Sequence, residues 1–308
     1  MEQTRRVPPG SIAGAALALG VLAALVWIGV RLATTPGASY PLTIEDDEGT
    51  TTTLERQPTR IVSYAPQFTE TLLRLGLIER IVGVSSAETA PPEALALTEV
   101  TARGGLDPDI EKIRRQKVDL VIAAGLPGAT WKAALAQEGI PVVTLNATSL
   151  DDAFDDLATV GRLVGTPAEA AELADGLRSQ VEGVEAAVSG RDRPQVVFET
   201  FFPPLVVAGP SSFTADLVRS AGGTLVPDDL RRGYREVDLD RLLEADPDYY
   251  LVTRLSASSV KAVRARDGFG KLRAVKEGNV VVLEDELVLR PGPRIVVGLE
   301  AVARALHP

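Results

Sequence analysis

The 308-residue chain contains no cysteine and a single histidine, His307, which is next to the last residue. The lack of cysteine excludes disulfides, iron–sulfur clusters, thiolate zinc sites, cysteine nucleophiles and a lipid-modified cysteine. One histidine at the end of the chain all but excludes a Ser-His-Asp hydrolase and a multi-histidine metal site. We therefore expect no enzyme, no cofactor and no metal site.

Basic residues are also scarce, with 32 Lys and Arg against 42 Asp and Glu, a net charge of −10. A protein that coats nucleic acid needs a basic face, so we expect no nucleic-acid partner. Residues 1–38 contain three arginines and one glutamate, which leaves 29 basic and 41 acidic side chains, a net of −12, in the remainder. Carboxylates are concentrated between Leu150 and Asp192, where we interpret them as a solvated helix face.

One long uncharged run is present, the 20 residues from Ser11 to Val30. A helix of that length spans roughly 30 Å, the thickness of the hydrocarbon core of a bilayer. Arg5 and Arg6 precede the run, which places the N-terminal tail in the cytoplasm and the chain after Arg31 outside. A cleaved signal peptide has a shorter apolar core, of about 7–15 residues, so we favour an uncleaved anchor and keep cleavage as the alternative.

The rest of the chain alternates short β-branched runs with helical patterns, which indicates βα units and largely parallel sheets. The predicted strands are Arg60–Tyr64, Ile81–Val84, Leu120–Ala123, Pro141–Leu145, Gln195–Glu199, Leu205–Ala208, Tyr249–Thr253 and Asn279–Leu283. The predicted helices are Phe68–Leu75, Ile110–Gln116, Trp131–Gln137, Phe213–Ala221, Leu239–Ala245, Ser258–Arg266 and Arg294–Leu306.

Between these two α/β regions, residues 150–190 contain no strand pattern. Leu173, Leu177, Val181, Val184 and Val188 recur at helical spacing and predict one stripe of a long helix. An earlier helical stretch runs into this helix and breaks at Gly165.

The two regions also repeat each other. The stretch DIEKIRRQKVDLVIA, from Asp109, matches DLDRLLEADPDYYLV, from Asp238, at a constant offset of 129 residues. One helix–strand unit in each half predicts two lobes related by a pseudo-twofold axis. The fold class that we predict is therefore α/β, with two Rossmann-like lobes joined by a long helix and preceded by a transmembrane helix. The predicted domains are a cytoplasmic tail (1–10), an anchor or signal segment (11–31), a linker and edge strand (32–57), an N-terminal lobe (58–148), a connecting helix (149–192) and a C-terminal lobe (193–308).

From about Pro58 onwards the chain resembles the substrate-binding proteins of ABC importers for iron chelates and cobalamin, the periplasmic-binding class with a single long connecting helix. The resemblance depends on the order and spacing of several stretches. They are PTRIVSYAPQFTETLLRLGLIERIVGVS, DIEKIRRQKVDLVIA, GIPVVTLNATSLDD, FFPPLVVAGPSSFTADLVRSAGG, REVDLDRLLEADPDYYLV and PGPRIVVGLEAVARAL. It implies a monomer outside the cytoplasmic membrane that delivers a small molecule to an ABC permease and its ATPase.

The resemblance also implies site residues. A carboxylate near the tip of each lobe pairs with the permease in this family, and these positions fall on Glu111 and Asp240, the second one methylene shorter than the usual glutamate. The alternative is two ordinary carboxylates in first helical turns. Ligand contacts are expected from aromatic and basic residues on the loops that leave the strands, namely Tyr64, Arg103, Phe201, Phe202, Tyr234 and Arg290. For Tyr64 and Phe202, core packing is an equal alternative.

Flat rings suit a large, partly apolar ligand, and arginines in an acidic protein favour an anionic one. We expect a ferric siderophore, with cobalamin or heme as the alternatives. A membrane-anchored ligand sensor is the alternative to import. The GLPGAT stretch at 125–130 lacks the lysine of a phosphate-binding loop, so we interpret it as a turn.

Overall fold

A computed structural model describes residues 38–308 apart from 90, 104, 126–129 and 231–232. Residues 38–308 form one compact unit. The predicted tail and the anchor or signal segment at 11–31 therefore lie outside the described residues, as does most of the GLPGAT stretch. Among the helices that the structure describes, none combines the length and the apolar character needed to cross a membrane.

The N-terminal lobe contains a four-stranded parallel sheet with the order β4-β3-β5-β6. Its strands are β3 (Ile61–Tyr64), β4 (Ile81–Val84), β5 (Leu120–Ala124) and β6 (Val142–Leu145). Leu120 and Ile122 of β5 pack into one core and Val121 and Ala123 into another, because successive side chains of a strand point to opposite faces. The sheet is thus buried on both faces, and its four strands confirm the sequence prediction to within a residue or two.

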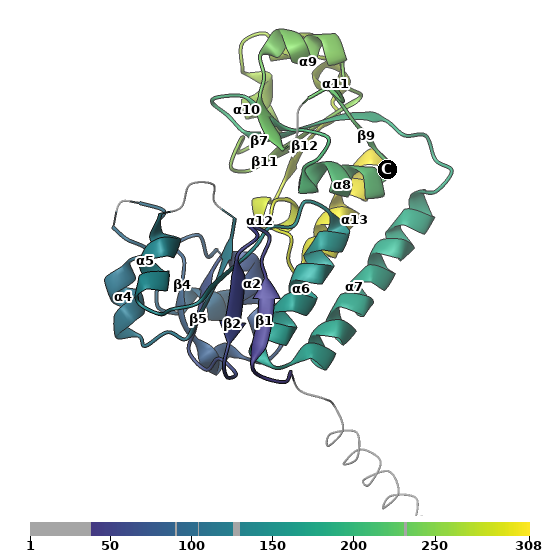
Figure 1. The fold of residues 1–308 in the computed structure, drawn as a ribbon. Helices are drawn as coiled ribbons and strands as arrows, with labels where there is room; N and C mark the ends of the chain where they lie inside the picture. Colours follow the sequence, from purple (N-terminus) through teal and green to yellow (C-terminus); the bar gives the residue numbers. More distant parts are fainter. Residues whose placement is uncertain (1–37, 90, 104, 126–129, 231–232) are drawn as a thin grey trace, which may run out of the picture. The chain divides into compact units, whose positions relative to one another are not determined.

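Helices cover both faces of this sheet (Figure 1). They are α2 (Pro66–Arg74), α3 (Pro92–Leu95), α4 (Ile110–Arg115) and α5 (Trp131–Gln137), with a 3-10 turn at Ile78–Arg80. Helix α2 begins two residues earlier than predicted because Pro66 takes a first-turn position, where proline needs no N–H partner. Before the sheet lies an antiparallel hairpin of β1 (Leu42–Glu45) and β2 (Thr51–Leu54), whereas a single edge strand was expected within 32–57.

The sheet of the C-terminal lobe is parallel in three of its five strand pairs, which agrees with the expected largely parallel sheet, and it has an antiparallel edge that was not expected. The main path is β10-β8-β7-β11-β12, with β9 paired to β7. Strands β7, β9, β11 and β12 run parallel, whereas β8 is antiparallel to both β7 and β10. A loop as short as 202–205 joins β7 to β8 only as a hairpin. The strands are β7 (Gln195–Phe201), β8 (Val206–Ala208), β9 (Thr224–Leu225), β10 (Tyr234–Glu236), β11 (Tyr249–Thr253) and β12 (Val280–Leu283).

Six helices belong to the described part of this lobe, with a 3-10 turn at Phe269–Lys271. They are α8 (Phe213–Ser220), α9 (Leu239–Ala245), α10 (Val260–Arg264), α11 (Arg273–Glu277), α12 (Asp285–Val288) and α13 (Ile295–Leu306). Helix α10 is shorter than the predicted Ser258–Arg266, because Ser259 caps it and it ends before Arg266.

The connecting region is two helices rather than one, α6 (Leu150–Val164) and α7 (Pro167–Val188), which lie side by side (Figure 1). Gly165 ends α6 in the left-handed conformation, where glycine carries no steric penalty, and Pro167 begins α7. The break predicted at Gly165 is confirmed. Helix α6 contributes Leu150 and Leu157 to the core of the C-terminal lobe and Leu163 to that of the N-terminal lobe.

The internal repeat extends to details of the backbone. Asp109 and Asp238 cap α4 and α9 by accepting from the N–H three residues on. Lys117 and Asp246, which stand 129 residues apart, are the two described non-glycine residues with positive φ. One helix–turn–strand unit has therefore kept its conformation in both lobes, as the repeat in the sequence predicts.

Candidate functional site

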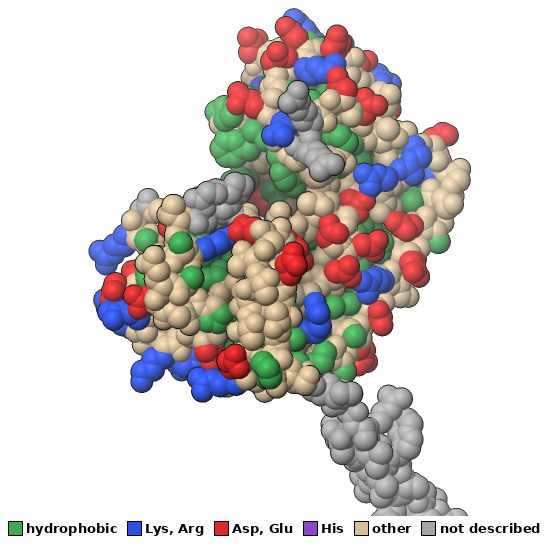
Figure 2. Space-filling model, viewed as in Figure 1, with side chains coloured by type: hydrophobic (Ala, Val, Ile, Leu, Met, Phe, Trp, Pro, Cys, Tyr) green, Lys and Arg blue, Asp and Glu red, His purple; other side chains and the backbone are tan. Residues whose placement is uncertain are grey.

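The carboxyl ends of the parallel strands of the two lobes face each other. Arg290 follows β12 and α12 in the C-terminal lobe, and its guanidinium donates to Thr89 Oγ1 and to the carbonyl of Ala87, both at 2.9 Å. Ala87 and Thr89 lie after β4 in the N-terminal lobe. Figure 2 shows the surface hollowed between the lobes, with hydrophobic side chains on the side of the C-terminal lobe. We call this hollow the interlobe cleft.

A second arginine, Arg294, strengthens this junction. Its guanidinium bridges Glu70 of α2, at 2.6 and 2.9 Å, and Glu286 of α12, at 3.0 Å. Burial alone would raise the pKa of Glu286, but hydrogen bonds from Arg294 and Thr89 lower it below the usual value. The two lobes are thus joined by charge-assisted hydrogen bonds at the base of the cleft, in addition to the connecting helices.

In the N-terminal lobe, Tyr64 is mostly enclosed. It ends β3, its side chain is only 7% exposed, and its hydroxyl donates to the carbonyl of Leu106 at 2.8 Å. Its ring lies 5.7 Å from that of Trp131, which is itself buried. Burial raises the pKa of Tyr64. Arg103 is exposed on the same loop as Leu106, so Tyr64 holds in place the loop that carries Arg103.

In the C-terminal lobe, Phe201 and Tyr234 present apolar surface. Phe201 ends β7 and is 41% exposed, and Tyr234 begins β10 and is 39% exposed. Both belong to strands that flank β8, where Phe201 pairs with Val206 and Tyr234 with Ala208. The Tyr234 hydroxyl lies 3.0 Å from Thr214 Oγ1, and burial of that end raises its pKa. The ring is therefore held by its hydroxyl while part of its surface stays accessible.

Phe202 is half-buried, with a charged group against one face. The Arg266 guanidinium carbon lies 3.8 Å from the centre of the Phe202 ring, and Phe269 meets that ring edge-on at 6.0 Å. Phe202 therefore packs against the core of the C-terminal lobe and also begins the loop after β7. Both roles that the sequence left open for it, core packing and ligand contact, are compatible with this position. The Arg266 contact was not expected from the sequence.

Two exposed leucines, one on the loop that carries Arg103 and one just after β11, were also missed. Leu106, on the loop after β4, is 78% exposed, and Leu255, just after β11, is 62% exposed. Single exposed leucines are common on protein surfaces, so the presence of a leucine does not by itself indicate a ligand site. Their positions after the carboxyl ends of parallel strands, the place where ligands bind in open α/β sheets, could have identified them.

Glu88 is a third residue that the sequence analysis missed. Its Oε1 accepts from Thr69 Oγ1 at 2.7 Å, whereas its buried Oε2 has no partner among the described residues. Burial raises the pKa of this carboxyl, and the nearby Arg290 opposes the effect. Glu88 therefore adds an acidic group next to the Arg290 junction.

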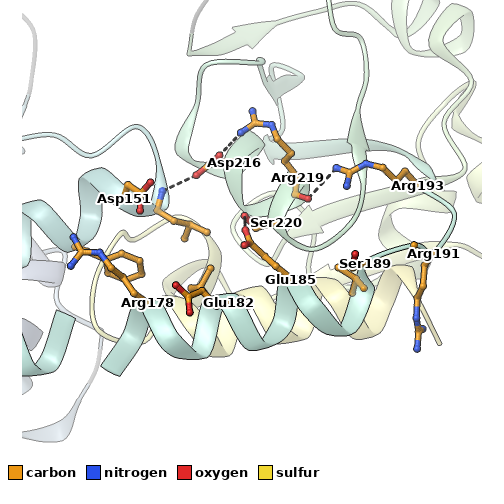
Figure 3. Close-up of a pocket in the computed structure, with 15 residues that line it drawn as sticks. Asp151, Arg178, Glu182, Glu185, Ser189, Arg191, Arg193, Asp216, Arg219 and Ser220 are labelled. Atoms are coloured by element: carbon orange, nitrogen blue, oxygen red, sulfur yellow. Dashed lines mark hydrogen bonds and ion pairs between the residues drawn. The ribbon is translucent and has the colours of Figure 1, made fainter. Parts of the chain in front are cut away.

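A well-formed cavity of about 570 Å³ lies elsewhere, where α7 meets α6 and α8 (Figure 3). The polar groups in it largely satisfy one another. Asp216 accepts from the Leu150 N–H at 2.8 Å and pairs with Arg219, and Glu185 accepts from Ser220 at 2.6 Å. None of the predicted ligand residues lines it. We interpret this cavity as a joint between helices rather than as the ligand site.

The two predicted docking carboxylates occupy equivalent positions, in the first turns of α4 and α9. Both are exposed. Glu111 pairs with Arg114 at 2.8 Å, and Asp240 lines an open hollow of about 980 Å³ together with Glu236 and Glu244. The last turns differ in charge, with Arg115 on α4 where Glu244 stands on α9. In the described parts of the chain, no group of three or more His, Cys, Asp or Glu side chains is arranged to hold a metal ion.

Comparisons with known proteins agree on the fold and the family. The structure is similar to one of an ABC-type Fe3+-hydroxamate transport system from Saccharomonospora viridis, with a TM-score of 0.73 and 28% identity over 88% of this chain and 100% of that one. A cobalamin-binding protein of Halobacterium salinarum is 30% identical over 278 residues, 87% of this chain and 75% of the relative.

An uncharacterized ABC transporter substrate-binding lipoprotein of Bacillus subtilis, YvrC, is 27% identical over 277 residues, 87% of this chain and 86% of the relative. The family described as periplasmic binding protein matches residues 61–287, about three quarters of the sequence and most of both lobes. The chain therefore belongs to the periplasmic binding protein family.

Proposed function

We propose that this protein is the extracytoplasmic substrate-binding component of an ABC importer, which captures a metal chelate between its lobes and delivers it to the membrane permease. The observation that carries the proposal is the interlobe cleft itself, in a chain of this family. Strand ends of both sheets meet there through Arg290 and Arg294. Such a meeting of strand ends is a ligand site in open α/β folds. The protein acts by binding, without catalysis.

As the ligand we propose a ferric siderophore. Exposed apolar side chains from both lobes, Leu106, Phe201, Tyr234 and Leu255, offer surface to a large, partly apolar molecule. Arg103 and Arg290 supply positive charge in an otherwise acidic protein, which favours the anionic groups of an iron chelate. The resemblance to the structure named for Fe3+-hydroxamate transport supports this choice.

Cobalamin is the second candidate, and a specific observation favours it. The relative from Halobacterium salinarum, at 30% identity, is named a cobalamin-binding protein. A corrin ring would use the same exposed aromatic and aliphatic surface, but would depend less on Arg103 and Arg290 because it is less anionic. Heme, and a sensor that passes its ligand to another membrane partner, remain the alternatives to these two.

Ligand titration of the full-length protein tests the proposal. Trp131 lies beside Tyr64 at the end of β3, so its emission should respond to a molecule in the cleft. The panel consists of a ferric trihydroxamate, a ferric catecholate, cyanocobalamin and heme, with calorimetry as a check against absorption by the coloured ligands. Saturable binding of a ferric siderophore is expected. Binding of cyanocobalamin alone would favour cobalamin as the ligand. If the folded protein bound no member of the panel, both the siderophore and the cobalamin proposals would be contradicted.

Substitution of Tyr234 tests the location of the site. Tyr234→Ala removes a half-exposed ring from the strand next to β8 and should weaken ligand binding by about 1–3 kcal/mol. The matched control is Tyr249→Ala, because Tyr249 starts β11 at the opposite, amino end of the sheet. Equal affinities of the two variants would place Tyr234 outside the site.

The importer role also implies partners and a location. We propose an ABC permease with its ATPase as the partners, and Glu111 and Asp240, one on each lobe, as the carboxylates that contact the permease. The binding domain works outside the cytoplasmic membrane as a monomer, and residues 11–31 attach it to the membrane or direct its export. The uncharged run of 20 residues supports this last point.

A further inference from the structure

A fully buried carboxylate lies just below the cleft. Glu199 of β7 is 0% exposed and stands two residues before Phe201. Its oxygens accept from Arg266 at 2.7 and 2.9 Å, and also from the hydroxyls of Tyr250 and Ser256. An unpaired carboxylate would not tolerate such burial, so these donors, drawn from separate segments of the lobe, make one connected unit.

Arg266 links this unit to the cleft loop. Its second terminal nitrogen donates to the carbonyl of Ser256 at 2.9 Å, so hydrogen bonds fix the edge of the guanidinium. The guanidinium carbon of the same group lies over the Phe202 ring, 3.8 Å from its centre, and 5.1 Å from the centre of the Phe269 ring. Phe202 begins the loop 202–205 between β7 and β8. The position of this loop is therefore tied to a buried ion pair.

Stability does not account well for such an arrangement. A buried ion pair can often be replaced by apolar residues of similar volume with no loss, or even with a gain, in stability. What an apolar pair would not provide is a planar group that is held by hydrogen bonds at both terminal nitrogens and lies over a ring. Arginine supplies both functions, whereas lysine supplies only the charge.

We propose that Arg266 is a positioning residue, which acts through Phe202 to hold the loop between β7 and β8, and with it Phe201, in the conformation that meets the ligand. The inference extends the proposed function, since it concerns the ligand site named there. Arg266 itself, with 9% of its side chain exposed, does not need to touch the ligand.

Two variants of the full-length protein separate positioning from stability. Arg266→Lys keeps a charge next to Glu199 but loses the stacked plane, and a double Glu199→Leu, Arg266→Met variant replaces the pair with apolar side chains. Both should unfold within a few degrees of the parent. Both should show faster amide hydrogen exchange at Phe201, Phe202 and Leu205. Both should bind the ferric trihydroxamate or cyanocobalamin, whichever the parent binds, about three- to tenfold more weakly.

The matched control is Arg254→Lys. Arg254 pairs with Glu284 at 2.6 Å at the same edge of the sheet, but both side chains of this pair are more than half exposed. This variant should change neither exchange nor affinity. Unchanged exchange in the 201–205 segment of Arg266→Lys would overturn the inference, as would faster exchange with unaltered affinity. If the parent binds no member of the panel, the proposed function fails, while exchange still decides whether Arg266 holds the loop.

Discussion

At the scale of single residues, Asp156 has the most perturbed acidity among the described carboxyl groups. It lies on α6 and is 7% exposed, and burial together with the charge of Asp47 raises its pKa from 3.8 to about 8. The folded state therefore holds a proton that the unfolded chain releases at a lower pH. Between about pH 4 and pH 8, stability should fall as the pH rises, because the folded state binds more protons than the unfolded one.

Asp156→Asn should remove this dependence, because the amide carries no charge at any pH. The variant should be more stable than the parent at pH 8, by on the order of 1 kcal/mol for each pKa unit of the shift that it relieves, by a smaller margin at pH 5, and nearly equal to it only near pH 4 or below, where the unfolded carboxyl is protonated too. Denaturant unfolding at the two pH values measures the effect. Asp155→Asn, at the exposed neighbour that pairs with Arg178, is the control. A parent as stable at pH 8 as at pH 5 would contradict the prediction.

The sequence predicted features that depend on neighbouring residues, and it did not predict contacts between residues far apart in the chain. The helix predicted at Trp131–Gln137 from neighbouring residues is present with the same bounds. Glu199 and Arg266 are 67 residues apart, and no periodic pattern in a sequence pairs an acid in a strand with an arginine beyond a helix. Arg290 was expected to contact ligand. The structure shows it joined to the opposite lobe through Thr89, and whether it also meets ligand stays a prediction.

At the scale of helices and strands, the α6–α7 pair depends on close approach at one glycine. A Cβ on Gly161 would overlap the Cβ of Ala170 and would lie 3.0 Å from the carbonyl oxygen of Thr166. Neither neighbour is the end of a flexible side chain, so the helices would have to separate. In a well-packed interface such overpacking outweighs the gain in helix propensity from alanine.

Gly161→Ala should therefore destabilise the protein by about 1–3 kcal/mol. The same substitution at Gly183, also helical but with no described atom within 4 Å of the place that its Cβ would take, should stabilise by about 0.5–1 kcal/mol. Denaturant midpoints of the two variants against the parent measure both effects. Shifts in the same direction would show that the close packing of α6 on α7 does not limit stability.

Elements with strong periodicity were predictable, and short irregular ones were not. Every strand expected from a β-branched run is present. Strand β10 was missed because its residues, YRE, are all exposed and polar or aromatic, and it exists only through pairing with β8. Strand β9 has two residues and depends on β7 in the same way. Such strands form only because they pair with another strand, and that strand is distant in the sequence.

At the scale of the whole molecule, the repeat places one exposed carboxylate on each lobe, Glu111 and Asp240, and we propose that both contact the permease. Replacement of Glu111 and Asp240 by alanine should abolish uptake of the ligand by cells that contain the cognate permease, because two contacts with the permease are lost together. Ligand binding by the purified variant should be unchanged, since neither residue is among those proposed to contact the ligand.

The control for this pair is the double alanine variant of Glu169 and Glu172, which makes the same change in net charge on exposed positions of α7. Uptake by the control should match the parent. Loss of ligand binding in the Glu111 and Asp240 variant would refute a docking role. Normal uptake would show that other groups make the contact.

The two-lobed division of the molecule does not make its lobes independent. Helix α6 places Phe154 in one core and Val160 in the other, one and a half turns apart on the same rigid element. Neither lobe can lose its core without exposing part of a helix on which the other depends. The lobes should therefore unfold as a single cooperative transition. A ligand that binds only the folded cleft then stabilises both lobes together, and a screen of melting temperatures would detect it even if its contacts were confined to one lobe.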